Sequence, residues 1–295
     1  MKPTLLPILS ARNCDDRDQY IQFFEEDHKY VITNDPENKY TSVTTWNHSH
    51  FPVFNANLII KNMMKGKNWK EGHKYWGLTA EEIKKQWSSN SSAVSGAGTD
   101  LHFEIECFMN NPDLESGYNK GNKGKGYNHS DLYEAYTLNP NTKNVVEWDY
   151  FINFVKDHPE LKPYRTEWTI YDEDLKISGS IDMIYENPDG TLSIYDWKRS
   201  KDITRVNNFN KFAINKLICH MPDSNFWHYA LQLNTYKRIL ERKYGKTVTD
   251  LYLVRLHPDA EEKNYELIKL PDLSKEVDEL FEERKQKLII NKENA

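Results

Sequence analysis

Hydrophobic and polar positions along the chain follow two different periods, and these periods predict strands and helices in mixed order. Short runs rich in β-branched and aromatic residues predict strands at residues 164–171, 177–185, 192–197, 247–256 and 264–270. Apolar residues spaced three and four apart predict amphipathic helices at about 145–158, 226–243 and 273–290. We therefore expect an α/β fold, with a central mixed sheet of about five strands flanked by helices.

The second and third of these strands form the clearest hairpin. Their connection, Asn187-Pro188-Asp189-Gly190, suits a type I turn followed by a glycine bulge, which would pair Asn187 with Thr191. Counting back in this register places Asp182 opposite Asp196. Directly opposed residues project to the same face with Cβ atoms about 5 Å apart, so the two carboxylates could share one cation.

Side chains alternate along a strand, so Lys198 is expected on the same face as Asp196, while Trp197 points toward the core. Two opposed carboxylates repel and raise one pKa unless a cation lies between them. Mg²⁺ suits such a position, because it takes oxygen ligands and is commonly held by one or two carboxylates plus substrate phosphate. A nearby lysine could orient a water or stabilise a phosphorane-like transition state.

The acid-x-Lys tripeptide alone carries little weight, because most such pairs are solvated surface charges. It recurs in this chain, for example beginning at Asp27, Glu82, Asp174 and Glu241. The upstream Asp182 at matching register is what distinguishes the tripeptide that begins at Asp196.

Further polar groups lie on neighbouring elements. Gly98-Thr99 is expected to open a helix capped by Thr99 or Asp100, with His102 and Glu106 one turn apart on one face. Strand 164–171 carries Glu167, and helix 226–243 carries Gln232 and Tyr236 at helical spacing. A lone histidine on a helix is more often a core or surface group, and a buried tyrosine hydroxyl is a common structural feature, so each residue also has a purely structural interpretation.

Taken together, the ordered motifs between residues 95 and 256 resemble the RecB-like branch of the PD-(D/E)xK nucleases, which has phage, viral and mitochondrial members. The resemblance implies a restriction-endonuclease-like core and a Mg²⁺ or Mn²⁺ cofactor; a histidine ligand suits Mn²⁺. It implies metal binding by His102, Asp182, Asp196 and Trp197. Catalytic or supporting roles are implied for Lys198, Asp182, Asp196, Glu167, Glu106, Gln232 and Tyr236.

An upstream segment resembles the leader that precedes the Gly-Thr-x-x-His helix in those members: His28-Lys29-Tyr30-Val31, then Tyr40 to Trp46. The resemblance implies that Ser42, Thr44 and Trp46 lie beside the DNA. The alternative is an ordinary strand-to-helix turn, in which Trp46 packs rather than stacks on a base.

Charge is unevenly distributed. The formal net charge is −6, yet lysines and arginines concentrate in residues 61–74 and 198–216. The second stretch adjoins the expected site, and its candidate nucleic-acid contacts are Arg199, Ser200, Lys201, Arg205 and Lys211. The alternative interpretation is that both basic stretches are ordinary solvated surface that binds no nucleic acid.

Composition narrows the class of protein. The three cysteines, Cys14, Cys107 and Cys219, are scattered, so we expect no iron–sulfur cluster, no disulfide framework and a reducing compartment. No run of 18 apolar residues predicts a membrane span, and no secretory signal is evident. We expect cytoplasmic or nuclear residence, with viral or phage origin compatible and a mitochondrial location less favoured.

We expect residues 1–94 to form a mainly helical N-terminal elaboration, with a β-hairpin, that roofs the site of a nuclease core at residues 95–295. A Gly-, Lys- and Asn-rich tract predicts a flexible insertion at about 111–144.

The expected activity is metal-dependent hydrolysis of DNA, more specifically exonuclease action on DNA ends or single strands, because no base-reading motif is present. Three alternatives remain: an endonuclease or ribonuclease of the same fold, a nucleic-acid-binding protein that has lost cleavage, and a glycosidase using Asp182 and Asp196. The sequence does not identify protein partners.

Overall fold

The structure is a computed structural model that describes residues 7–24, 26–27, 29–112, 114, 126–138 and 145–293. His28 lies outside the described residues, as do residues 113, 115–125 and 139–144 of the expected 111–144 insertion. The rest of that insertion is not all loop, because His129–Leu138 form a helix in which His129 and Leu132 are buried. Within the described residues, no helix is both long enough and apolar enough to cross a membrane.

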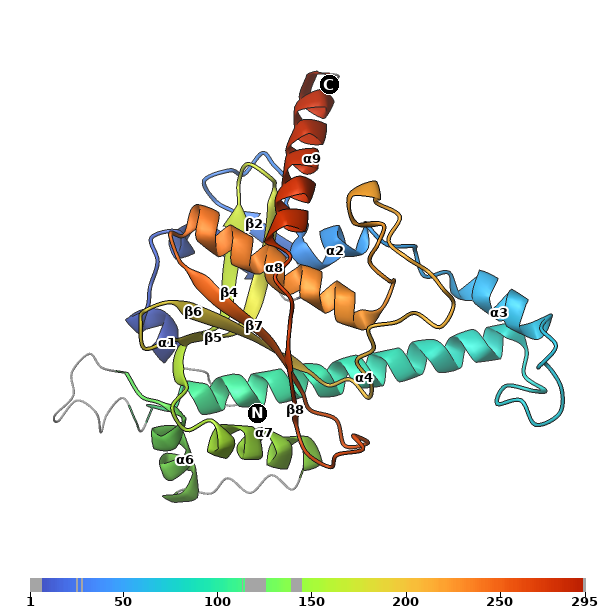
Figure 1. The fold of residues 1–295 in the computed structure, drawn as a ribbon, viewed down its shortest axis with the longest axis horizontal. Helices are drawn as coiled ribbons and strands as arrows, with labels where there is room; N and C mark the ends of the chain where they lie inside the picture. Colours follow the sequence, from blue (N-terminus) through green and yellow to red (C-terminus); the bar gives the residue numbers. More distant parts are fainter. Residues whose placement is uncertain are drawn as a thin grey trace.

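The centre of the fold is a mixed six-stranded sheet, which confirms the α/β expectation (Figure 1). Its strands are β3 (Thr41–Ser42), β4 (Lys162–Asp172), β5 (Ile177–Glu186), β6 (Leu192–Lys198), β7 (Val248–Arg255) and β8 (Glu266–Lys269). β6 pairs with β7 in parallel and with β5 antiparallel. The strand that the sequence did not predict is β3, which is two residues long and too short to show a periodic pattern.

The β5–β6 hairpin has the predicted turn and register. Asn187 N–H donates to Thr191 O at 2.8 Å, and Gly190 has a φ of +81°, as a glycine bulge requires. The paired residues run from Glu186 opposite Leu192 to Met183 opposite Tyr195. One further step in the same register brings Asp182 opposite Asp196.

Helices cover both faces of the sheet. One face packs against α8 (Asn225–Lys243), α2 (Val43–His48) and α9 (Ser274–Glu293). The other face packs against α1 (Ile8–Arg12), α6 (His129–Leu138), α7 (Val146–Asp157) and the second half of α4 (Ala80–Met109). Burial of both sheet faces explains why β6 is apolar on both sides, with Ile194 in one cluster and Trp197 in the other.

The start of the His102 helix was predicted wrongly. α4 begins at Ala80, because Thr79 and Glu82 form a capping box in which Thr79 Oγ1 accepts from Glu82 N. Thr99 is mid-helix and its hydroxyl donates to Ser95 O at 3.1 Å, so it caps nothing. Gly98 is tolerated inside the helix, and a Cβ there would meet nothing within 4 Å. The expected domain boundary at 94/95 lies inside this helix.

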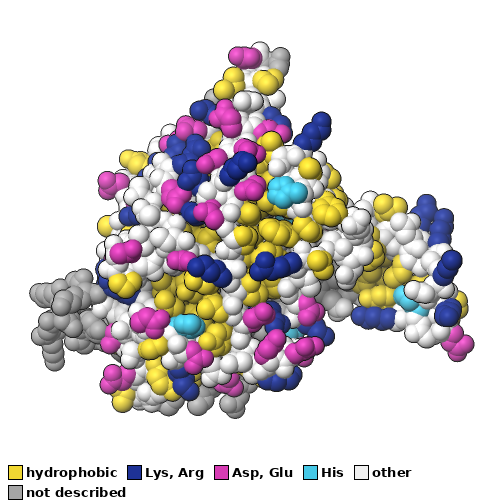
Figure 2. All heavy atoms as spheres, viewed as in Figure 1, with side chains coloured by type: hydrophobic (Ala, Val, Ile, Leu, Met, Phe, Trp, Pro, Cys, Tyr) yellow, Lys and Arg dark blue, Asp and Glu magenta, His cyan; other side chains and the backbone are white. Residues whose placement is uncertain are grey.

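The N-terminal region is partly helical and partly extended. It contains the 3₁₀ turn Asp18–Tyr20, the antiparallel pair β1 (Ile21–Phe24) and β2 (Lys29–Ile32), and α3 (Ala56–Met64). A second 3₁₀ turn, Lys216–Ile218, lies between β6 and α8. α3 and the first half of α4 form an extension that projects from the body (Figures 1 and 2).

Candidate metal centre

Three acidic residues lie side by side on neighbouring strands. In the β4–β5 register, Glu167 falls between Thr166, which pairs with Met183, and Trp168, which pairs with Ile181, so it is opposite Asp182. Asp196 lies opposite Asp182 on the other edge of β5. Three consecutive strands therefore place one carboxylate each at the same level of the sheet.

The second half of α4 adds His102 to this row. His102 Nδ1 lies 3.4 Å from Asp182 Oδ2 and 3.9 Å from Glu167 Oε1. One donor atom from each of these three residues lies within 4.8 Å of the others, as a shared cation requires. Glu167, expected to be an auxiliary acid, belongs to this donor group.

The backbone of Trp197 orients two members of the group. His102 Nε2 lies 2.9 Å from Trp197 O, and because a carbonyl only accepts, Nε2 must carry the hydrogen. That leaves Nδ1 directed at the carboxylates. Trp197 N–H donates to Asp182 Oδ2 at 3.1 Å. Trp197 was expected at the metal; in this structure its carbonyl holds the histidine ring instead, an arrangement common around metal-binding histidines.

The crowded acids have raised pKa values. Burial, with the nearby Asp182 and Glu106 carboxylates, raises the pKa of Glu167 to about 8, although Ser180 donates a hydrogen bond to it at 3.0 Å. Burial alone raises the pKa of Glu106, one turn beyond His102, to about 7. Negative charge is thus concentrated beyond what the neighbouring cations offset, which favours a bound cation.

Glu167 also has an unusual backbone. Its φ is +43°, a left-handed conformation in the middle of β4 for a residue with a side chain. Such a conformation costs about 1–2 kcal/mol and persists only where surrounding structure imposes it. Here the continuous pairing of β4 with β5 on both sides of Glu167 imposes it, and the side chain is directed to the donor group.

Asp196 was expected to share a cation with Asp182, but it is not part of the donor group. It is 2% exposed and outside the three-donor group of the described residues, because its Oδ2 pairs with Lys198 Nζ at 2.5 Å. Burial and Asp182 raise the pKa of Asp196 to about 6, against the opposing effect of Lys198. Burial would lower the pKa of Lys198, but Asp196 and Asp182 together raise it above its usual value, so Lys198 remains an ammonium.

Gln232 and Tyr236 contact each other on the predicted face of α8. Gln232 Nε2 donates to Tyr236 Oη at 3.1 Å, and Tyr236 is 3% exposed. Burial, Tyr30, Asp182 and Asp196 raise the pKa of Tyr236, which places its hydroxyl near the acids. A Cβ on Gly179 would lie 2.7 Å from Tyr236 Cε1, so the glycine is what admits this ring.

Sequence reasoning missed three residues near the site. The Tyr229 ring lies 4.7 Å from Lys198 Nζ, and burial with Glu167 and Asp182 raises the pKa of Tyr30 to about 12. Ser180 bonds Glu167. Strand alternation could have identified Ser180, which is two residues before Asp182, and helical spacing could have identified Tyr229, which is three residues before Gln232.

The Ser42–Trp46 segment forms the strand-to-helix turn of the alternative interpretation. Ser42 is the N-cap of α2 and accepts from Thr45 N at 3.1 Å, and Thr44 is exposed. Trp46 is 4% exposed and its ring centroid lies 5.5 Å from that of Phe281. Packing, rather than stacking on a base, is therefore the role of Trp46 in this structure.

Of the candidate nucleic-acid contacts after Lys198, some have side chains that contact the protein and others have exposed side chains. Arg199 Nε donates to Glu147 Oε1 at 2.8 Å, and Ser200 Oγ donates to Asp202 O at 2.9 Å. The Arg205 guanidinium lies 4.1 Å from the Phe226 ring centroid. Lys201 and Lys211 have exposed side chains. Arg199 and Ser200 are thus occupied within the protein.

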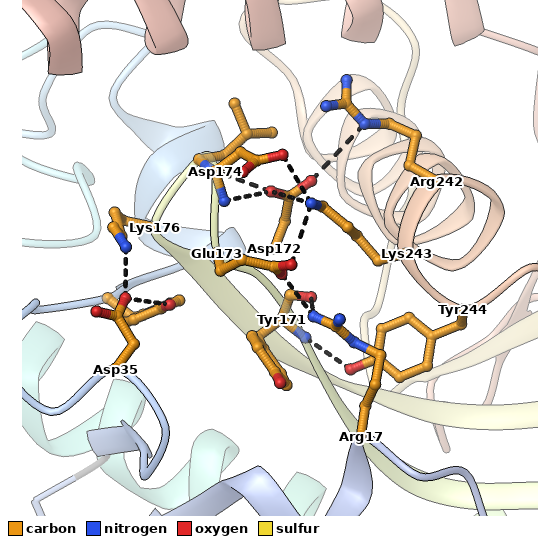
Figure 3. Close-up of polar contacts among 12 residues, drawn as sticks. Arg17, Asp35, Tyr171, Asp172, Glu173, Asp174, Lys176, Arg242, Lys243 and Tyr244 are labelled. Atoms are coloured by element: carbon orange, nitrogen blue, oxygen red, sulfur yellow. Dashed lines mark hydrogen bonds and ion pairs between the residues drawn. The ribbon is translucent and has the colours of Figure 1, made fainter.

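A second acid-x-Lys tripeptide, Asp174-Leu175-Lys176, has acids with cationic neighbours, unlike the crowded acids of the site (Figure 3). It lies in the β4–β5 turn, where Lys243 Nζ contacts Asp174 Oδ2 at 2.7 Å and Lys176 pairs with Asp35. Nearby Asp172 is fully buried, with Arg242 Nε at 3.7 Å. These acids have cationic neighbours, so the cluster has no need of a metal ion.

Comparison with known proteins found no match to any protein-family model and no significant match to any curated protein.

Proposed function

We propose that this chain is a metal-dependent nuclease of the RecB-like PD-(D/E)xK type, which hydrolyses DNA phosphodiester bonds at ends or in single strands. The observation that carries the proposal is the donor group His102, Glu167 and Asp182 beside a lysine kept protonated by Asp196. A restriction-endonuclease-like core is part of the proposal, supported by the β5–β6 hairpin and by the α/β architecture.

The donor set fits Mg²⁺ or Mn²⁺. Two carboxylates suit either ion, and an imidazole nitrogen favours Mn²⁺. The raised pKa of Glu167 supports the fit, because a divalent cation would offset the repulsion that causes it. When bound, the ion would offset charge on the scissile phosphate and lower the pKa of a water molecule.

The chain's own residues would do the remaining work. Lys198, fixed between Asp196 and the Tyr229 ring, can donate to a phosphoryl oxygen as negative charge develops on it. Its raised pKa means that it acts as a cation and not as a proton acceptor. Glu106 lies outside the donor group and has a pKa near neutrality, so it can exchange a proton with solvent.

The test is degradation of end-labelled DNA by purified protein with Mn²⁺ or Mg²⁺, with EDTA as the control. Asp182→Asn should abolish degradation, whereas the matched Asp189→Asn, in the exposed turn of the same hairpin, should retain it. Linear substrates should disappear faster than circular ones. If no DNA or RNA of any form is degraded with either metal, the proposal is wrong, and activity that survives EDTA would favour a glycosidase instead.

A further inference from the structure

The α3–α4 arm is the extension that consists of α3, residues 65–79 and the first half of α4. It projects from the body, and basic side chains, all of them lysines, gather at its far end (Figure 2). Residues 56–85 hold seven lysines and three glutamates, a local charge of +4 in a chain of net charge −6. The local charge of the arm is therefore positive, whereas the net charge of the chain is negative.

The arm lysines are exposed and available to a ligand. Lys61, Lys65, Lys67, Lys70 and Lys74 each have an exposed side chain. In the part of the chain that the structure describes, none of them forms an ion pair with an acid. Exposed lysines that lack an acidic partner can neutralise phosphates by releasing counterions, which is the main source of nonspecific affinity for nucleic acid.

Aromatic contacts hold the arm in shape. The Trp69 and Trp76 ring centroids lie 5.8 Å apart, and Trp87 Nε1 donates to Tyr75 Oη at 3.0 Å. The segment between the helices is thus tied to α4, so its lysines keep a defined position relative to that helix.

A groove of about 850 Å³ runs along α4 at the base of the arm. Its lining includes Phe54, Lys84, Trp87, Ser88, Ser91 and Ser95. Phe54 is 71% exposed, which leaves an aromatic face accessible to a ligand. A cation and accessible aromatic faces in one groove are the features with which proteins bind single strands, because bases stack on the rings and phosphates contact the cation.

α4 connects this groove to the metal centre. Lys84 and His102 are 18 residues apart, which is five full turns, so both project in the same direction from the one continuous helix. At about 1.5 Å per residue the separation is about 27 Å, the length of about eight nucleotides at a stacked spacing of about 3.4 Å.

We propose that the α3–α4 arm and the groove at its base bind single-stranded DNA and direct it along α4 to His102. This inference rests on the proposed nuclease function and adds the path of the substrate. A single strand is favoured over an acidic protein surface because the groove combines exposed aromatic faces with lysine, and because the same helix continues to the donor group.

The experiment separates binding from cleavage. Binding of a labelled 20-nucleotide single strand is measured in EDTA by fluorescence anisotropy at several salt concentrations. Lys67→Ala/Lys70→Ala should weaken binding on the order of tenfold. The slope of log K against log salt concentration should become shallower by about 1.4, because each lost phosphate contact removes about 0.7. Phe54→Ala should weaken binding on the order of tenfold through lost stacking. The control, Lys275→Ala/Lys285→Ala on α9, should bind as the wild type does.

Cleavage with Mn²⁺ then tests the path. The arm variants should raise KM for the 20-nucleotide strand with little change in kcat, and should cleave a four-nucleotide strand, too short to reach the groove, as the wild type does. If arm and control variants bind the long strand equally well, the inference is wrong even if cleavage occurs. If the arm variants lose binding but no protein cleaves, the arm binds DNA and the nuclease proposal fails.

Discussion

Replacing Lys198 with methionine should destabilise the protein as well as abolish cleavage. Methionine keeps the apolar stem of the side chain and removes the ammonium that Asp196 contacts at 2.5 Å. Asp196 is 2% exposed, so the variant leaves a buried carboxylate without its cation. Removing one partner of a buried pair costs about 3–5 kcal/mol, and the lower end applies here because Asp196, whose pKa is already raised to about 6, can take up a proton.

A double-mutant cycle isolates the pair. Asp196→Asn alone should cost about 1–2 kcal/mol, because Lys198 lies nearer the surface and can reach water. Lys198→Met/Asp196→Asn removes both charges and should cost only about 1 kcal/mol, since replacing both members of a buried pair is often nearly neutral. The expected coupling energy is therefore about 3–4 kcal/mol.

The assay is urea unfolding at pH 7.5, read by tryptophan fluorescence, with m-values compared between variants to confirm that the same surface is exposed. Lys201→Met, an exposed lysine on the following segment, is the matched control and should shift stability by less than about 0.5 kcal/mol. Destabilisation by the double variant equal to the sum of the singles would refute the ion pair. A double variant that folds well but cleaves nothing would show that cleavage needs the Lys198–Asp196 pair for a reason other than stability.

Three other changes test separate parts of the structure. His129 is fully buried, and burial lowers its pKa to about 3, so below pH 6.5 protons bind the unfolded chain preferentially. The free energy of unfolding at pH 5 should therefore be about 2 kcal/mol lower than at pH 7. His129→Gln should remove that loss, as measured by urea unfolding at the two pH values. Gly179→Ala forces a Cβ against the Tyr236 ring and should cost about 1–3 kcal/mol in thermal unfolding; an unchanged Tm would mean that Tyr236 moves freely. Trp46→Ala should cost about 3–5 kcal/mol by emptying a core position, while DNA affinity of the folded fraction stays unchanged; lost affinity at full stability would instead place Trp46 on a base.

The hairpin could be predicted because local chemistry determines it. Asn187 to Gly190 specify one turn, and the turn fixes every pair that follows, so the sequence alone aligns Asp182 with Asp196. Strands β4 to β8 and helix α8 were equally accessible, because the strands are short runs rich in β-branched and aromatic residues and α8 has apolar residues at helical spacing.

Local patterns failed where long-range packing decides the outcome. The middle of α4, from Ser88 to Gly96, is exposed and has no apolar stripe, so nothing in its pattern indicated a helix continuous from Ala80. The pairing partner of Asp196 was also beyond the sequence, because register places two carboxylates opposite each other but does not say which one turns toward Lys198 and which toward His102.

The two acid-x-Lys tripeptides compared above differ in charge balance, and this difference carries functional information. In the β4–β5 turn, Asp174 contacts Lys243 and Lys176 pairs with Asp35, so the charges stabilise the fold by themselves. At the candidate metal centre, burial and the neighbouring acids raise the pKa of Glu167 to about 8, which is unfavourable for folding alone. A fold that leaves acid uncompensated on β4 and β5 beside His102, while the acids of the β4–β5 turn have cationic neighbours, has that point available for a cation and a substrate to complete.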